Sequence, residues 1–438
     1  MDKISGFSDD VLLVKILSFL PTKDAVSTSI LSKQWKFLWM RVPKLEYDDI
    51  NIYMKRRFIA ESLRSEKSQR MRSFINKNLP LHSSPFIESL YLRFFTASFE
   101  PEDIKLWVEI AVSRSVQELT VKFYLPKGIS NCALLPTSLY TCESLMTLKL
   151  RDRILVDVPH GFCLPSLKTL HLENVTYADE ESLQRLLSNC PVLEDLVVER
   201  RREGDNVTKF AVNIPSLLSL SIAISGQCSY VIDAPSLKYF GAKYFSESPS
   251  TGVIGNMPKL EEANITTGLE SETLDIKKLL KPVASVKRLS LYILNSSAEA
   301  VYCDDSIFKE LEHLNLQLFN SYWSKLVFWL LKASPKLRDL NCHEQFFLHG
   351  MDTLACWKQQ TSSVPRCLLS SLQTFKWSGY HVSVEGRDLA TYILRNSCLL
   401  KTAKVSIGPG MDPQKKLEME VEVINSCRGS PTCNLVFD

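Results

Sequence analysis

The chain has 438 residues, of which 45% are hydrophobic and 23% charged, so it can bury a large core and is not a disordered protein. Lys and Arg total 52 against 49 Asp and Glu. The resulting net charge of +3 gives no bulk field that would favour nucleic acid or an anionic membrane. No signal peptide pattern comes first, and the apolar stretch 11–20 is too short to cross a bilayer and contains Lys15. We therefore expect a soluble, intracellular protein that binds neither nucleic acid nor membrane.

The sequence lacks the local motifs of enzymes. It has no glycine-rich phosphate loop, no Gly-x-Ser-x-Gly elbow and no His-Glu-x-x-His. Its twelve cysteines include no Cys-x-x-Cys pair, which predicts reduced and mostly buried thiols. Cys342, His343, His349 and Cys356 match no zinc spacing. We predict no catalytic residue, metal or cofactor, and an enzyme is disfavoured, although a triad can assemble from distant positions.

Residues 1–45 carry a helical pattern. In "FSDDVLLVKILSFLP", Ser8 is a suitable N-cap, two acidic residues follow in the first turn, and Pro21 ends the helix. We predict a second helix from Thr22 and a third from Ser32. The apolar stripes of these helices comprise Leu12, Ile16, Phe19, Leu20, Val26, Ile30, Leu31, Trp35, Leu38 and Trp39. Because so short a segment cannot enclose that surface, the surplus should meet another protein or the chain that follows; the alternative is a cap that buries its own face.

A repeat is the strongest signal in the rest of the chain. After residues 46–84, which we interpret as a linker and cap, an apolar residue followed by others three and five positions later recurs about every 26 residues, a period typical of solenoids. The thirteen leading positions are Ile87, Val116, Leu145, Leu167, Leu193, Leu217, Leu237, Leu260, Val286, Leu311, Leu337, Leu372 and Leu400.

Alternation inside each repeat indicates a short strand with one solvated face. In the fourth repeat, Leu170 and Leu172 would point into the hydrophobic core, while Thr169, His171 and Glu173 would point to solvent. Helical stretches lie between the strands, such as "EDIKLWVEIAVSR", "DEESLQRLLSNC" and "YWSKLVFWLLKAS". Because a single strand and helix cannot bury their apolar sides alone, the repeats must stack. The predicted fold is an α/β solenoid with a curved parallel sheet.

The repeats resemble the leucine-rich repeat family, over roughly Ile87 to Ile407. The asparagine that this family usually carries eight residues after the leading leucine is missing from most repeats, for instance at Val175. The spacing also varies, from 20 residues after Leu217 to 35 after Leu337. We therefore expect an irregular solenoid with bulging loops near residues 344–366.

The N-terminal stretch "ISGFSDDVLLVKILSFLPTKDAVSTSILSKQWKFLW" resembles an F-box, the helical module that docks on a Skp-type adaptor of cullin ubiquitin ligases. The family usually carries Leu-Pro where this chain has Phe7 and Ser8. The adaptor-binding residues that the resemblance implies are Phe7, Leu12, Leu13, Ile16, Leu17, Leu20, Pro21, Asp24, Ala25, Leu31, Lys33, Trp35, Leu38 and Trp39.

The C-terminal part resembles the FBD region, through "CLLSSLQTFKWSGY", "YILRNSCLLKTAKVSI" and "SPTCNLVFD". The three resemblances together identify a plant F-box/FBD/LRR-repeat protein. They imply an F-box over 1–45, a linker and cap over 46–84, leucine-rich repeats over 85–364 and an FBD region over 365–438 that holds the last repeats and a cap.

The resemblance implies a non-catalytic substrate-recognition subunit of a Skp-cullin-F-box ubiquitin ligase. Its partners would be a Skp-type adaptor, through it a cullin, and an unknown protein target, in the cytoplasm or the nucleus. Holding the target near a conjugating enzyme would supply catalysis by proximity. The alternative is an adaptor-bound regulatory or ligand-sensing repeat scaffold that does not direct degradation.

Basic and aromatic residues occupy solvent-facing positions of the first three repeats. We predict that Tyr91, Arg93, Lys122, Lys149 and Arg151 lie close together on the inner face of the sheet. Two interpretations stay open. These residues form either a mixed solvated surface or a basic pocket that binds an acidic peptide or a phosphorylated small molecule. If the target binds elsewhere, the stretch "EQFFLHGMDTLACW" between Leu337 and Leu372 is the next candidate.

Overall fold

The structure is a computed structural model. It describes residues 10–49, 61–94, 99–123, 132–200, 207–224, 229–244, 252–267, 280–293, 308–318, 323–344, 363–380, 384–407 and 428–437, with isolated positions between 414 and 424. The chain forms two compact units, Met1–Leu217 and Leu218–Asp438, which we call the first and the second unit.

The first unit begins with four short helical elements. They are α1 (Asp10–Leu17), α2 (Thr22–Ser27) and the 3-10 helices η1 (Thr28–Ile30) and η2 (Trp35–Arg41). The predicted second helix is confirmed, whereas the predicted N-cap Ser8 lies outside the described residues. Two predictions were wrong. The first helix ends at Leu17, where 3-10 type bonds lead to Leu20, and the helix predicted from Ser32 begins instead at Trp35, as η2.

A parallel sheet makes up most of the first unit. Its strands, in spatial order, are β1 (Lys44–Asp48), β2 (Ser89–Phe94), β3 (Glu118–Phe123), β5 (Thr147–Arg151), β7 (Thr169–Glu173) and β9 (Asp195–Glu199). A small second sheet consists of β4 (Ala133–Leu134), β6 (Ile154–Val156) and β8 (Thr176–Tyr177), and β10 covers Lys209–Asn213. The remaining elements are α4 (Glu61–Asn78), η3 (Leu79–Leu81), α5 (Pro101–Val112), η4 (Thr137–Thr141) and α6 (Ser182–Ser188).

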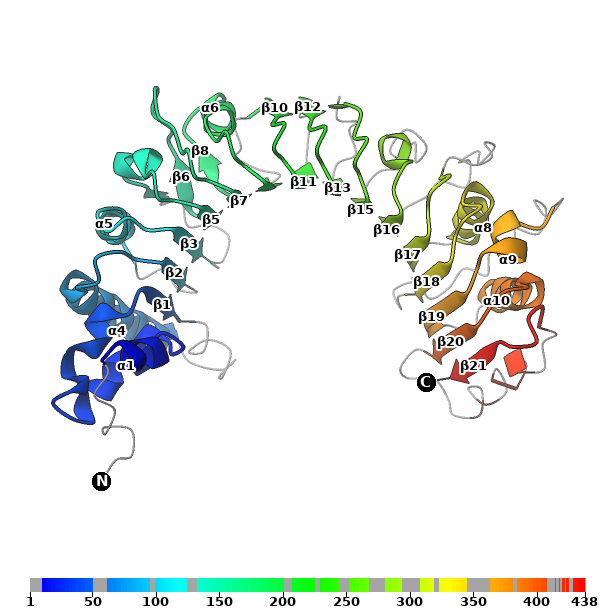
Figure 1. Cartoon of the computed structure of the whole chain (residues 1–438), viewed down its shortest axis with the longest axis horizontal. Coiled ribbons are helices and arrows are strands. Elements are labelled where there is room, and N and C mark those ends of the chain that lie inside the picture. Colours follow the sequence, from blue (N-terminus) through cyan, green and yellow to red (C-terminus); the bar gives the residue numbers. More distant parts are fainter. Residues whose placement is uncertain are drawn as a thin grey trace. The chain divides into compact units, whose positions relative to one another are not determined.

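Helix α5 illustrates how these segments encode their structure. The side chain of Glu100 accepts a hydrogen bond from the backbone of Asp103, whose carboxylate accepts one from the Glu100 amide at 2.9 Å, so the capping box satisfies amides of the first turn. Ile104, Trp107 and Ala111 follow at helical spacing and are fully buried. The helix thereby covers one face of the sheet (Figure 1). We call the opposite face of each unit's sheet its open face.

The second unit repeats this arrangement. Its parallel strands, in order, are β11 (Ser219–Ile224), β13 (Tyr239–Tyr244), β15 (Glu262–Thr267), β16 (Arg288–Ile293), β17 (His313–Leu318), β18 (Asp339–Glu344), β19 (Thr374–Tyr380), β20 (Thr402–Ile407) and β21 (Asn434–Phe437). The other elements are the paired strands β12 (Ser229–Asp233) and β14 (Gly252–Ile254), η5 (Lys281–Val283), α8 (Trp323–Ala333), α9 (Arg366–Ser370) and α10 (Val384–Asn396). Helices α8, α9 and α10 lie on one side of the strands (Figure 1).

All thirteen predicted strands are present, each beginning two residues after its leading position. The predicted alternation is confirmed where it was most explicit, because Leu170 and Leu172 are fully buried and His171 is only partly covered. Two further strands of the main parallel sheets were missed, as were the short strands β4, β6, β8, β10, β12 and β14. Val42, Leu45 and Tyr47 follow the same spacing in β1, which crosses the predicted boundary at residue 45, and β21 adds a strand in the C-terminal cap. The loops expected near 344–366 fall mostly outside the described residues.

Candidate functional site

The N-terminal helices have a core of their own. Leu13, Leu17, Ala25, Trp35, Leu38, Trp39 and Val42 form one buried cluster. Trp35 is 3% exposed and Trp39 is 6% exposed, so both rings pack inside the module. The two tryptophans therefore belong to the module's own core rather than to its exposed apolar surface. The amphipathic stripes wrap around the indole rings, which fill most of the interior of this small module.

A second set of apolar side chains remains on the surface of the same helices. Exposed large hydrophobic residues in this module are Val11, Leu12, Ile16, Phe19, Leu20, Ile30, Leu31 and Phe37. Phe19 and Ile30 are 79% and 89% exposed. Large apolar surface left exposed next to a complete core is typical of an interaction site.

The structure divides the implied adaptor-binding residues into two layers. Leu12, Ile16, Leu20, Pro21, Asp24, Leu31 and Lys33 are exposed. Leu13, Leu17, Ala25, Trp35, Leu38 and Trp39 are buried beneath them and fix the positions of the helices. Phe7 lies outside the described residues. A partner that binds this module without remodelling it can contact only the first layer.

The module is fixed to the first repeats by hydrogen bonds. Strand β1 follows η2 directly and pairs with β2 over its whole length. The amide of Glu46 donates to Oγ1 of Thr22 at 2.7 Å, and buried His82 places Nε2 2.6 Å from the carbonyl oxygen of Val42. Burial lowers the pKa of His82, which favours the neutral ring. The helices and the start of the sheet therefore form one body.

The predicted basic residues of the first unit do lie together on its open face. Arg93, Lys122 and Arg151 are direct neighbours on β2, β3 and β5. The same row begins with Asp48 on β1 and continues to Glu173 on β7. Tyr91 lies one row away and contacts the Arg93 guanidinium at 5.5 Å from its ring centre.

Carboxylates hold the cations of this row. Arg93 Nε donates to Asp48 Oδ1 at 3.0 Å, and a second bond joins the same two groups. Arg151 Nη1 donates to Glu173 Oε2 at 2.8 Å, and Lys122 Nζ lies 4.0 Å from Glu173 Oε1. Lys149, in the adjacent row, lies between Thr120 and His171. This pairing argues against a basic anion pocket and supports the mixed-surface interpretation, because a phosphate would have to displace carboxylates already in place.

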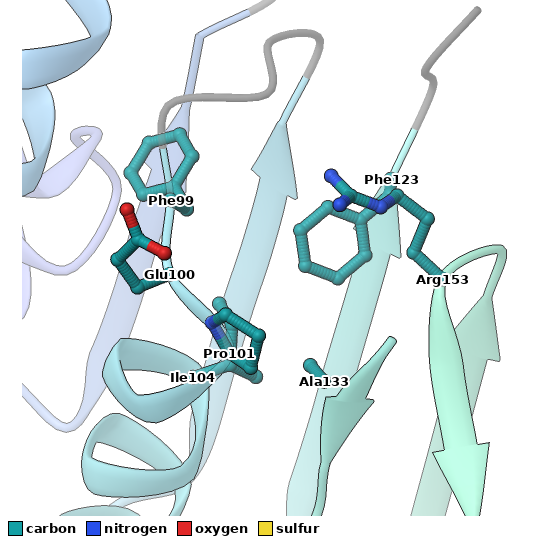
Figure 2. Close-up of a pocket in the computed structure, with 7 residues that line it drawn as sticks. All are labelled: Phe99, Glu100, Pro101, Ile104, Phe123, Ala133 and Arg153. Atoms are coloured by element: carbon teal, nitrogen blue, oxygen red, sulfur yellow. The ribbon is translucent and has the colours of Figure 1, made fainter. Parts of the chain in front are cut away.

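Two hollows of the first unit differ in what they can hold. One, of about 330 Å³, lies between the end of α1 and the first strands, and its lining includes Phe19, Leu20, Tyr91 and Arg93. The other lies between the start of α5, Phe123 and Arg153 (Figure 2) and has a volume of about 10 Å³, room for about one water molecule. Only the first is large enough for a side chain of a partner.

A third hollow lies on the open face of the second unit. Its volume is about 300 Å³, and it is lined by residues of five neighbouring strands, from β15 to β19. The polar lining residues are Glu262, Arg288, Ser290, His313, Asn315, Asp339, Asn341, Thr374 and Lys376. None of these residues was predicted as a site residue, although the strand register would have aligned them.

Metal ligands do not gather in the described part of the chain, and burial affects two of its thiols. Burial raises the pKa of the Cys190 and Cys367 thiols to about 12, so both are uncharged near neutral pH. Among the described residues, no group of three His, Cys, Asp or Glu could hold a metal ion. Of the four residues compared with zinc spacings, His349 and Cys356 lie outside the described residues. No described helix combines the length and apolar character needed to span a bilayer.

Three family models match the chain in the order of its elements. The F-box domain model matches residues 9–47, the model of the LRR repeats of an FBD-associated F-box protein matches 104–274, and the FBD model matches 359–405. A putative F-box/FBD/LRR-repeat protein of Arabidopsis thaliana is 63% identical over the full length of both chains. The chain belongs to the plant F-box/FBD/LRR-repeat family.

Two further Arabidopsis relatives extend this family assignment. A putative FBD-associated F-box protein is 65% identical over 97% of this chain and 85% of its own length. An FBD-associated F-box protein is 45% identical over the full length of both. In this F-box protein the F-box match covers α1 to β1, and the FBD match covers α9, β19, α10 and most of β20. The FBD match therefore ends inside β20, and β21, the last strand of the second unit, lies beyond it.

Proposed function

We propose that this F-box protein is the substrate-recognition subunit of a Skp-cullin-F-box ubiquitin ligase. The exposed apolar layer of the F-box binds a Skp-type adaptor, which links the chain to a cullin, and the open faces of the repeats hold a target protein. The chain itself is non-catalytic, and it acts in the cytoplasm or the nucleus.

The observation that carries the proposal is the coexistence of a complete core and an exposed apolar layer in the F-box. Leu12 and Ile16 are each 42% exposed and lie one helical turn apart on α1, while Leu13 and Leu17 next to them are fully buried. The module therefore does not need the outer layer to fold, and burial of that layer by an adaptor would add stability through binding.

The fixed joint between F-box and repeats supports the same role. Because β1 continues the F-box into the sheet, a target on the open face of the first unit would keep a constant position relative to the adaptor. Orienting two reactants in this way lowers a barrier without any catalytic side chain.

The test is co-expression of the full chain with a plant Skp-type adaptor, followed by size-exclusion chromatography and calorimetry. Wild type should elute as a one-to-one complex. Leu12→Asp combined with Ile16→Asp should weaken adaptor binding by about a hundredfold or more, because two carboxylates would be buried in an apolar interface. Leu106→Asp on α5 is the matched control, since Leu106 is 48% exposed outside the F-box. Equal loss in the control, or full binding by the double variant, would refute the proposal.

The alternative, an adaptor-bound scaffold that does not direct degradation, shares the adaptor contact. The two functions separate in a reconstituted ubiquitination assay. A degradation receptor transfers ubiquitin to a bound target only while Leu12 and Ile16 are intact, whereas a regulatory scaffold binds both partners without transfer.

A further inference from the structure

The hollow on the open face of the second unit contains a row of small polar side chains. Ser290 on β16, Asn315 on β17 and Asn341 on β18 are direct neighbours across the strands, and Lys376 on β19 continues the row. Neighbouring strands lie about 4.8 Å apart, so the four side chains span roughly 14 Å across the sheet. The leucine that immediately precedes each of the first three residues, at positions Leu289, Leu314 and Leu340, is buried on the other side of its strand.

These polar side chains have unused hydrogen-bonding capacity. In the described part of the chain, none of Ser290, Asn315, Asn341 and Lys376 has a hydrogen-bond or ion-pair partner for its side chain. Each asparagine amide offers donors and an acceptor, as a peptide unit does, and the lysine offers a positive charge. The first unit's row differs, since Asp48 and Glu173 hold its cations.

The neighbouring row at the start of the same strands is paired within itself. Arg288 Nε donates to Glu262 Oε2 at 2.9 Å, and His313 Nδ1 lies 2.6 Å from Asp339 Oδ2. A nucleic acid would place a phosphate against each of the two carboxylates in the lining, whereas a peptide can place one acidic side chain at Lys376 and neutral residues elsewhere. Arg288 and His313 each have a carboxylate partner, whereas Lys376, also in the lining, has none among the described residues.

The shape of the groove favours an extended chain over a small molecule. Its lining crosses five neighbouring strands, from β15 to β19, so the groove is elongated along the open face rather than closed around a compact ligand. An extended segment rises about 3.3 Å per residue, so four to five residues would cover the row. Amides at regular intervals can bind its backbone irrespective of sequence, while the lysine selects charge.

We propose that this groove binds an extended, acidic segment of the target protein. Ser290, Asn315 and Asn341 hydrogen-bond to the backbone of the segment, and Lys376 pairs with an Asp or Glu side chain. The inference rests on the proposed function, of which it names the target class and the place where the target is held.

The test uses the full-length chain and a phage library of random twelve-residue peptides. Selection should enrich peptides that carry Asp or Glu, and one of these, labelled with fluorescein, is titrated by fluorescence anisotropy. Asn315→Ala with Asn341→Ala should weaken binding about tenfold, at roughly 0.7 kcal/mol for each hydrogen-bonding side chain. Lys376→Glu should weaken it by at least about tenfold, and added salt should weaken wild-type binding.

Lys287→Ala is the matched control, since Lys287 is exposed just before β16 and outside the groove. It should stay within about twofold of wild type. Enriched peptides without acidic residues, or binding unchanged in both groove variants, would overturn the proposal. So would loss of binding on amidation of the peptide's C-terminus, because the carboxylate would then come from the chain end rather than from a side chain.

Adaptor binding by the same variants separates this inference from the proposed function. If the groove variants bind the adaptor normally and the peptide selection fails, the groove assignment alone is wrong. If the peptide binds as expected and the full chain does not bind an adaptor, the proposed function is wrong while the groove stands.

Discussion

The open faces of the two units use the same strand pattern but treat charge differently. On the first unit, the row Asp48, Arg93, Lys122, Arg151 and Glu173 places three cations side by side between two carboxylates, and each cation is paired with one of them. On the second unit, the row through Ser290, Asn315 and Asn341 is neutral and unpaired among the described residues. The buried positions of each repeat determine that a strand forms and how it stacks. The solvent-facing positions determine whether the polar groups of the open face pair with one another or remain available to a ligand.

The largest expected effect tests what the two units share. Leu170→Asp in the first unit and Leu314→Asp in the second should each destabilise the protein by more than about 3 kcal/mol, because both side chains are at most 2% exposed and a buried carboxylate has no partner there. Urea unfolding followed by circular dichroism measures the loss. Asn315→Ala should change stability by less than about 0.5 kcal/mol. Similar losses at Leu314 and Asn315 would contradict the strand register.

A smaller effect should distinguish the two rows. Glu173→Ala should cost about 1 to 2 kcal/mol, since its carboxylate is 15% exposed and contacts both Arg151 and Lys122. Asn341→Ala in the second unit should cost less than about 0.5 kcal/mol, because Asn341 has no partner among the described residues. Thermal unfolding of the two variants gives the difference. If Asn341→Ala costs as much as Glu173→Ala, the second row is not open.

The smallest effect concerns acid sensitivity of the first unit. Burial lowers the folded-state pKa of His82 below its usual 6.5, so the folded protein binds the proton less readily than the unfolded chain. Stability is therefore complete above pH 6.5 and falls as the pH drops below it. Hydrogen exchange of β1 between pH 7 and pH 5 should show this loss, and His82→Gln should flatten the pH dependence. An unchanged pH dependence in the variant would show that another group is responsible.

The sequence determined the positions of the strands because it specifies which face of each strand is buried. Leu170 and Leu172 alternate with polar residues, and only a strand gives that period of two. Repetition of the same spacing through Leu400 then required stacking, since no single repeat can bury its apolar side. The F-box was recognisable for a different reason, because its apolar helix residues, Asp24-Ala25 and Lys33-x-Trp35 stand in the order that the family carries.

Tertiary structure alone decided which side chains meet. Asp48 neutralises Arg93 from a strand that had not been predicted, and Glu173 reaches Lys122 across an intervening strand. Trp35 entered the core of the F-box while Ile16 stayed outside, although both lie on apolar stripes. A stripe shows that a helix has an apolar side, but packing with its neighbours decides how much of that side they cover. Asn315 and Asn341, whose amides have no partner among the described residues, are neighbours only through the strand register, because they lie 26 positions apart in the chain.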